Sequence, residues 1–356
     1  MVNTSSSATR YRSLNRAQAL LVIALVSLAM GVCLAASRGI ASSDLPSTSD
    51  DPSQGDAAFY TRVVQRLHRG EAYYDALGAE LRLRRFPTSS VFNWRTPLHL
   101  ETIAHLPSFG YARSLVIIGA LCAVGLAFVA VFRAGRFELA ILQVFVMCFA
   151  LAVTALPGAL LFSDVWAGVL ITISIGAYAL GWRHTGAGAG VLALFYRELA
   201  LPYAMIGVIL AWREGRRSEL LVWLAGMIAY AVYFGLHAAA VMSHMPASGV
   251  ASSPVLWLGF GGVRFLLMTS RVGLLLGLPF WVAALYLPMA LLGLFGWVAP
   301  IRLRLIATVG VYLLAFSVVG LPGNFYWGAI YAPLLAYGAT WSVPACRDLA
   351  RAVILK

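Results

Sequence analysis

Residues 17–36 read AQALLVIALVSLAMGVCLAA, a run without a charged side chain. About twenty apolar residues are what an α-helix needs to cross the hydrocarbon core of a bilayer. Arg10, Arg12 and Arg16 precede the run, as in a signal peptide, but no convincing cleavage site follows it. We therefore interpret the run as an uncleaved signal anchor that forms the first transmembrane helix.

Similar apolar runs fill much of the remaining chain, at 113–132, 138–157, 164–181, 218–240, 305–320 and 328–343. Hydrophobic residues make up 61% of the sequence and charged residues 11%, against about 25% charged in soluble domains. Two further runs are ambiguous. Residues 272–300 form either one tilted helix broken near Pro279 or a span with an interfacial piece. Residues 187–212 form either one span or two short helices that meet at 197–202.

The basic residues favour the two-helix interpretation of 187–212, because cytoplasmic loops collect Arg and Lys. With the N-terminus inside and a hairpin at 187–212, every short basic loop after the first helix falls inside. These loops contain Arg133, Arg136, Arg183, Arg213, Arg216, Arg217, Arg302, Arg304, Arg347, Arg351 and Lys356. With a single span, the last eight cations lie outside unless 272–300 crosses twice. The net charge of +12 then reflects membrane orientation, and we expect no nucleic-acid partner.

We thus predict an all-α polytopic membrane protein with about ten transmembrane helices and a large extracytoplasmic first loop. The expected parts are a cytoplasmic N-terminus (1–16), a first transmembrane helix (17–36), the loop (37–112), a multi-helix transmembrane domain (113–343) and a cytoplasmic tail (344–356). No cysteine lies in the loop, so we expect neither a disulfide framework nor a zinc site.

The loop itself has two predicted parts. Residues 41–54 are rich in Ser, Asp and Pro and are expected to be flexible. Phe59, Val63 and Leu67 then recur every four residues after Asp56, which stands at an N-cap position. We expect an amphipathic helix over 57–69 on the outer membrane face, and a second interfacial helix around residues 254–265.

Charged residues inside apolar runs are candidates for function, because charge in hydrocarbon is costly. Asp164, Arg197 and Glu198 lie within or at the edge of spans, and Arg113, Arg264 and Arg271 lie at outer boundaries. In the predicted topology these candidates, Asp56 and the loop 323–327 all lie on the outer side. A transport path should instead have polar groups at several depths, including the inner side.

Four short motifs resemble those of a known superfamily. They are GDAAFY (55–60), RGEAYY (69–74), WRTPLH (94–99) and FSD (162–164). Their order and spacing are similar to the first outer loop and fourth span of GT-C glycosyltransferases, which include the protein O-mannosyltransferases and the lipid A aminoarabinose transferases. The resemblance covers roughly residues 17–240; the last third matches in general layout. Where the family often has paired acids, this chain has Gln54-Gly55 before Asp56.

The resemblance implies a sugar donor linked to polyprenyl phosphate and an acidic base or metal ligand in the first loop, which Asp56 matches. It makes Asp164 the second catalytic acid, and the two aspartates could share a divalent cation, Mg²⁺ or Mn²⁺. The expected substrate-binding residues are Tyr60, Arg95, Arg197, Glu198, Arg271, Asn324 and Tyr326. The competing interpretations are helix caps for both aspartates, a structural Arg197–Glu198 pair and a snorkelling Arg271. His99 and His105 are expected to be structural.

The expected function is therefore sugar transfer to an envelope glycan, lipid or protein acceptor on the extracytoplasmic face. The bias of Arg over Lys suggests a GC-rich bacterial genome, and so the bacterial inner membrane with a site facing the periplasm. Two alternatives stay open: a transporter or lipid flippase, and a non-catalytic subunit of an envelope-assembly complex.

Overall fold

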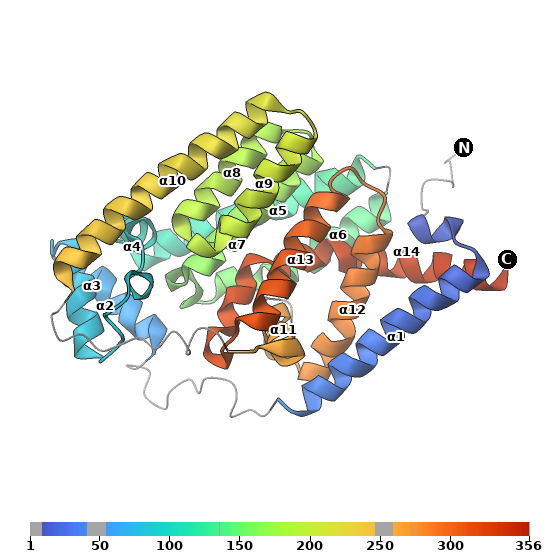
Figure 1. Cartoon of the computed structure of the whole chain (residues 1–356), viewed down its shortest axis with the longest axis horizontal. Helices are drawn as coiled ribbons and strands as arrows, with labels where there is room; N and C mark the ends of the chain where they lie inside the picture. The colour runs from blue at the N-terminus through green and yellow to red at the C-terminus, as the bar shows by residue number, and fades with distance from the viewer. Residues whose placement is uncertain (1–8, 41–54, 135, 246–258, 274, 356) are drawn as a thin grey trace.

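The computed structural model describes residues 9–40, 55–134, 136–245, 259–273 and 275–355, and these contain α- and 3₁₀-helices but no strand (Figure 1). The segment 41–54, predicted to be flexible, lies outside the described residues. So does most of the second predicted interfacial helix. Its described part belongs to α11 (Gly262–Ser270).

Three helices are long and apolar enough to cross a membrane: α1 (Arg16–Arg38), α5 (Phe109–Phe132) and α10 (Arg217–His244). Each contains one of the predicted runs. The apolar helices α6 (Phe137–Ala150), α7 (Ser163–Ala179) and α12 (Phe280–Gly296) are shorter, and α13 (Arg302–Val318) covers the run at 305–320. The helical fold class is confirmed for the described residues, whereas the number of spans stays a prediction.

Two predicted spans differ from the observed helices. The run 138–157 is helical only to Ala150, and 3₁₀ turns follow at Ala152–Ala155 and Ala159–Leu161. The run 328–343 begins within two 3₁₀ helices (Pro322–Ile330, Ala332–Leu334), and the last helix, α14 (Leu335–Ile354), starts later. Pro322 and Pro333 lie in the first turns of these two 3₁₀ helices, where a missing amide hydrogen breaks no helical bond. Helix α14 also continues through residues 344–354 of the predicted tail.

Residues 187–212 form two helices, α8 (Arg183–Tyr196) and α9 (Leu201–Arg213), as the basic loops predicted. Arg197 is extended (φ −151°, ψ 120°) and ends α8, and a 3₁₀ turn over Glu198–Ala200 leads into α9. Trp223 of α10 packs against both α8 and α9, the two arms of this hairpin. A Cβ added at Gly190 of α8 or at Gly207 of α9 would lie 2.3 Å from the Trp223 indole. The three helices lie side by side (Figure 1). In the other ambiguous run, α12 begins directly after Pro279, and turns precede it.

The long loop 37–112, predicted to be the outer loop, contains α2 (Asp56–His68), α3 (Tyr73–Leu83), a 3₁₀ turn (Val91–Asn93) and α4 (Pro97–Ala104). Helix α2 matches the predicted helix, but the N-cap assignment was wrong. Gly55 is the cap, with φ 104°, and Asp56 is the first helical residue, without a side-chain capping bond. Phe59 and Val63 are buried, and α2 packs against α3 and α4. Protein therefore covers the apolar face of α2.

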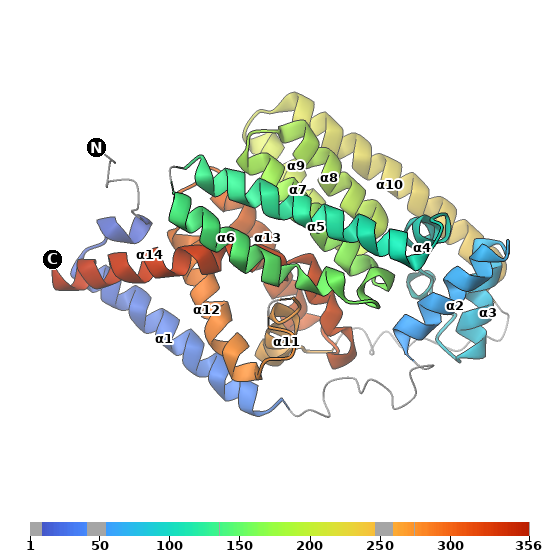
Figure 2. The same cartoon turned by 180° about the vertical axis from the view of Figure 1, so that it is seen from behind.

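The helices α2–α4 lie at one end of the molecule, and both termini lie at the other (Figures 1 and 2). Helix α1 runs along one edge and contacts chiefly α12 and α14. The turn Arg10–Ser13 joins this end to α14, because the amide and hydroxyl of Thr9 donate to Asp348 Oδ2 at 2.6 and 3.0 Å. This packing places the cavity described next far from the chain termini.

Candidate functional site

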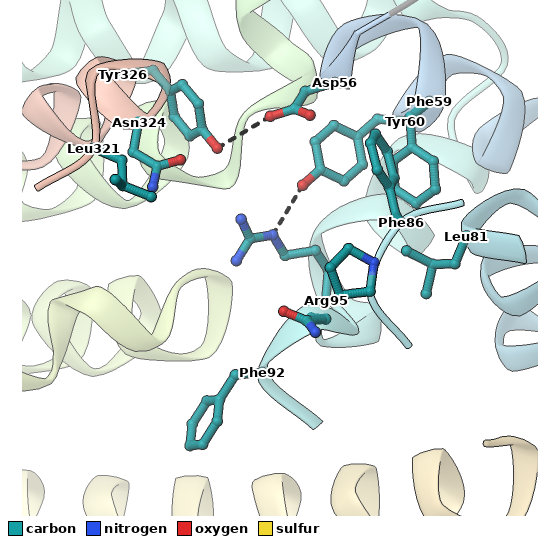
Figure 3. A pocket seen from close by; sticks show the side chains of 12 residues that line it. Asp56, Phe59, Tyr60, Leu81, Phe86, Phe92, Arg95, Leu321, Asn324 and Tyr326 are labelled. Atoms are coloured by element: carbon teal, nitrogen blue, oxygen red, sulfur yellow. Dashed lines mark hydrogen bonds between the residues drawn. The ribbon is translucent and has the colours of Figure 1, made fainter. Parts of the chain in front are cut away.

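A cavity of about 280 Å³ lies among the outer-loop helices and the 3₁₀ segment Pro322–Ile330 (Figure 3). Its apolar wall consists of Phe59, Leu81, Phe86, Pro87, Phe92 and Leu321. Its polar side chains are Asp56, Tyr60, Asn93, Arg95, Asn324 and Tyr326. Four of the predicted substrate-binding residues and the predicted base therefore line one cavity, although 270 residues of sequence separate Asp56 from Tyr326.

Asp56 is held at the cavity by a residue from the other half of the chain. The Tyr326 hydroxyl donates to Asp56 Oδ2 at 3.2 Å (Figure 3). The Tyr326 ring in turn packs on Phe162, 4.7 Å between ring centroids. Asp56 is half-buried, and within the described residues this is its one hydrogen bond through the side chain. The carboxylate thus keeps capacity to accept a further proton or hydrogen bond.

Arg95 is the cation of the cavity. Its Nε donates to the Tyr60 hydroxyl at 2.9 Å (Figure 3), and its Nη1 donates to Glu198 Oε1 at 3.3 Å. Burial raises the pKa of Tyr60, so the phenol stays neutral near pH 7 and accepts this bond. The guanidinium is therefore fixed between the outer loop and the tip of the α8–α9 hairpin.

Behind Arg95 lies a buried ionic chain. Arg197 Nη1 donates to the same Glu198 oxygen at 2.6 Å, and Arg197 Nε donates to Asp164 Oδ1 at 2.9 Å. Arg197 and Asp164 are each 1% exposed, and charges so deeply buried need partners. Asp164 does not cap α7, whose N-cap is Phe162 without a side-chain bond. The pairing of Arg197 with Glu198 occurs, but it is part of this longer chain.

The remaining candidates lie elsewhere. Arg271 does not line the cavity: its Nη2 donates to the Leu278 carbonyl at 2.5 Å, and its guanidinium lies 3.8 Å from the centre of the Phe280 ring. His99 is buried, with Nε2 2.9 Å from the Leu160 carbonyl oxygen, which fits the structural role expected of it. His105, Arg113 and Arg264 are exposed.

A divalent cation shared by Asp56 and Asp164 does not fit these side chains. Asp164 already carries the Arg197 guanidinium, so a metal ion there would meet the positive charge of that guanidinium. Among the residues that the structure describes, no group of three or more His, Cys, Asp or Glu side chains is placed to hold a metal ion. We derive no chemical step through a metal.

Sequence reasoning missed the aromatic wall and a second buried ionic cluster. Glu219 Oε1 accepts from Arg304 Nη2 at 3.1 Å and from the Tyr178 hydroxyl at 2.8 Å, and Arg304 lies 3.6 Å from the centre of the Tyr178 ring. Glu219 is 1% and Arg304 5% exposed. The predicted topology places Arg304 in an inner loop, so in that topology buried polar groups lie on the inner side as well as on the outer side. The sequence signal that could have indicated this cluster is Glu219, a single acidic residue in the first turn of the apolar helix α10.

No protein-family model, curated protein or solved structure matches this chain.

Proposed function

We propose that this protein is a membrane glycosyltransferase that takes a sugar from a polyprenyl-phosphate-linked donor. The acceptor is an envelope glycan, lipid or protein on the extracytoplasmic face. One observation carries the proposal: Asp56 and Arg95 face the same cavity, whose other wall is largely apolar and aromatic (Figure 3). Glycosyl transfer from a lipid phosphate uses a carboxylate to accept the proton of the acceptor and a cation to stabilise the leaving phosphate. Asp56 and Arg95 supply these two charges in one cavity.

The proposed reaction forms a bond between the acceptor oxygen and the anomeric carbon and breaks the bond from that carbon to the donor phosphate. The acceptor hydroxyl loses its proton as it attacks, and the Asp56 carboxylate accepts it. The phosphate leaves with the bonding electron pair, and Arg95 stabilises its developing charge through charge-assisted hydrogen bonds. Tyr60 and Glu198 hold the guanidinium in place during this step, so little reorganisation is needed.

The wider setting belongs to the same proposal. About ten spans, with the hairpin α8–α9 entering the bilayer from the inner side, would place the cavity at the outer surface of a bacterial inner membrane. Helix α2, which begins at Asp56, and helix α4, which begins two residues after Arg95, lie at the end of the molecule opposite the turn Arg10–Ser13 and the end of α14 (Figure 2), which supports this orientation.

The test is sugar transfer from a labelled pool of polyprenyl-phosphate sugars in membranes that contain the wild type or Asp56→Asn. We expect transfer by the wild type and a loss of about 10²–10⁴-fold in the variant, as for removal of a general base. Asp75→Asn is the matched control, because Asp75 is an acid of the same loop that is largely exposed and lies outside the cavity. Equal transfer by wild type and Asp56→Asn would refute the assignment of the base.

One observation favours a transporter as a second candidate. Further buried polar contacts lie between the ionic chain of Asp164, Arg197 and Glu198 and the Glu219 cluster. The Tyr312 hydroxyl donates to the Leu199 carbonyl at 2.8 Å, and the hydroxyls of Ser174 and Tyr203 lie 2.6 Å apart. Substrate flux into proteoliposomes that survives Asp56→Asn but is lost in Glu219→Gln would favour transport over transfer.

A further inference from the structure

A second cavity lies at the opposite end of the molecule from Asp56, between the helices α1 and α12. Its volume is about 270 Å³, and its walls are apolar, with Val22, Val26 and Ala29 of α1 facing Leu291 and Phe295 of α12. Only Ala19 and Cys33 of α1 are buried, so most of the helix beside the groove is exposed on the surface of the molecule.

Tyr11 closes the groove at the N-terminal end of α1. Its ring contacts Gly296, where a Cβ would lie 2.7 Å from the ring, and its hydroxyl donates to the Leu292 carbonyl at 3.1 Å. These contacts fix the tyrosine across α12. The groove therefore has a defined end, which is set by packing and by one hydrogen bond.

Two arginines flank this closed end. Arg10 precedes Tyr11 in the turn Arg10–Ser13, and Arg302 opens α13 six residues after Gly296, which the Tyr11 ring contacts. Among the described residues neither arginine forms an ion pair. The nearby carboxylate of Asp348 is buried and accepts from the amide and hydroxyl of Thr9. Arg10 and Arg302 thus form no ion pair with a described acidic residue, and they lie beside an apolar groove. This combination is complementary to a lipid with an anionic headgroup.

We infer that this groove binds one chain of an anionic phospholipid, with the lipid phosphate between Arg10 and Arg302. The apolar walls exclude water from the chain, and guanidinium groups suit phosphate oxygens because their N–H groups form paired hydrogen bonds. The bound lipid would brace α1 against α12 at the end where the chain termini meet. This inference does not depend on the proposed function.

The experiment uses the purified full-length chain, incubated with an equimolar mixture of phosphatidylglycerol and phosphatidylcholine. Native mass spectrometry then counts the lipids that stay bound. We expect one retained phosphatidylglycerol. The double variant Arg10→Gln/Arg302→Gln should lose about 25-fold in preference, about fivefold for each cation near the phosphate. The control Arg183→Gln/Arg213→Gln changes two exposed basic residues on α8 and α9, outside the groove, and should keep the preference.

A second pair of variants tests the groove without changing any charge. Ala29→Trp fills the cavity and should abolish retention of both lipids, whereas Ala24→Trp, on an exposed part of α1 outside the lining, should not. Equal retention of the two lipids would overturn the inference. So would an unchanged preference in the Arg10/Arg302 variant, or a second copy of the chain in place of lipid.

Discussion

Arg197 donates from Nε to Asp164 Oδ1 across 2.9 Å, and both side chains are almost completely buried. Asp164 opens α7 and Arg197 ends α8, so this bond ties the first turn of one helix to the last turn of the next. The two side chains form a buried ion pair, whereas Asp56 is the carboxylate that lines the cavity.

Breaking the pair should destabilise the fold. Asp164→Asn leaves the buried Arg197 with Glu198 as its one acidic partner among the described residues, and removing one member of a buried pair typically costs about 3–5 kcal/mol. We expect a clearly lower melting temperature in detergent than for Asp75→Asn. The double variant Asp164→Asn/Arg197→Gln should lose less than the sum of the two single variants. Simple additivity of the two losses would show that the pair is not coupled.

Arg95 should be sensitive even to a conservative change. Arg95→Lys keeps the charge but loses the planar guanidinium, which donates to Tyr60 and to Glu198 at the same time. In the transfer assay we expect a loss of about 10–100-fold, the value of one charge-assisted hydrogen bond. Arg62→Lys, at an exposed position of the same loop, serves as the control. If both variants transfer like the wild type, Arg95 does not contact the leaving phosphate.

His99 should make stability fall in mild acid. Burial lowers the pKa of His99 from 6.5 to about 4. The unfolded chain therefore binds a proton first as pH falls, so the stability from neutral His99 is complete above about pH 6.5 and is lost towards pH 4, at about 1.4 kcal/mol per pH unit. Melting temperatures from pH 7 to 4.5 measure this. The slope should be smaller in His99→Gln and unchanged in His105→Gln. Equal slopes in both variants would refute the assignment.

The α8–α9 hairpin should tolerate added volume at one glycine and not at another. A Cβ at Gly207 would lie 2.3 Å from the Trp223 indole, whereas a Cβ at Gly188 meets nothing within 4 Å. Gly207→Ala should cost about 1–3 kcal/mol through overpacking, and Gly188→Ala should be neutral or stabilising by up to about 1 kcal/mol. Thermal unfolding of the two variants side by side decides the point. Similar melting temperatures would mean that Trp223 is not wedged between the arms.

Much of the helical framework could be predicted because it depends on local composition. The runs that became α1, α5 and α10 contain enough apolar residues to be helical wherever they pack. The period-four pattern predicted α2, and the basic loops predicted the break at Arg197. The 3₁₀ segment at 322–334 was not predictable, because Gly328 there lies against the Thr269 carbonyl, a contact made in the tertiary structure.

The sequence predicted which residues line the candidate site better than it predicted the contacts that these residues make. Asp56, Arg95 and Tyr326 were chosen for their residue types, their motifs and their predicted side of the membrane, and they do line one cavity. The cap assigned to Asp56 failed because Gly55 can adopt φ 104° and takes that position itself. Glu219 and Arg304 were not predicted to be buried, because a sequence does not distinguish an exposed charge at the end of a span from a charge buried between helices.

The position of α1 has a consequence for how the protein is made. Thr9 and Asp348 bond across 339 residues of sequence, and α1 packs on α12 and α14. At about 5–20 residues per second, translation of the intervening chain takes on the order of tens of seconds. During that time α1 waits without its partners. Its largely apolar surface suits this wait, and α1 can complete its packing only after α14 has been synthesised.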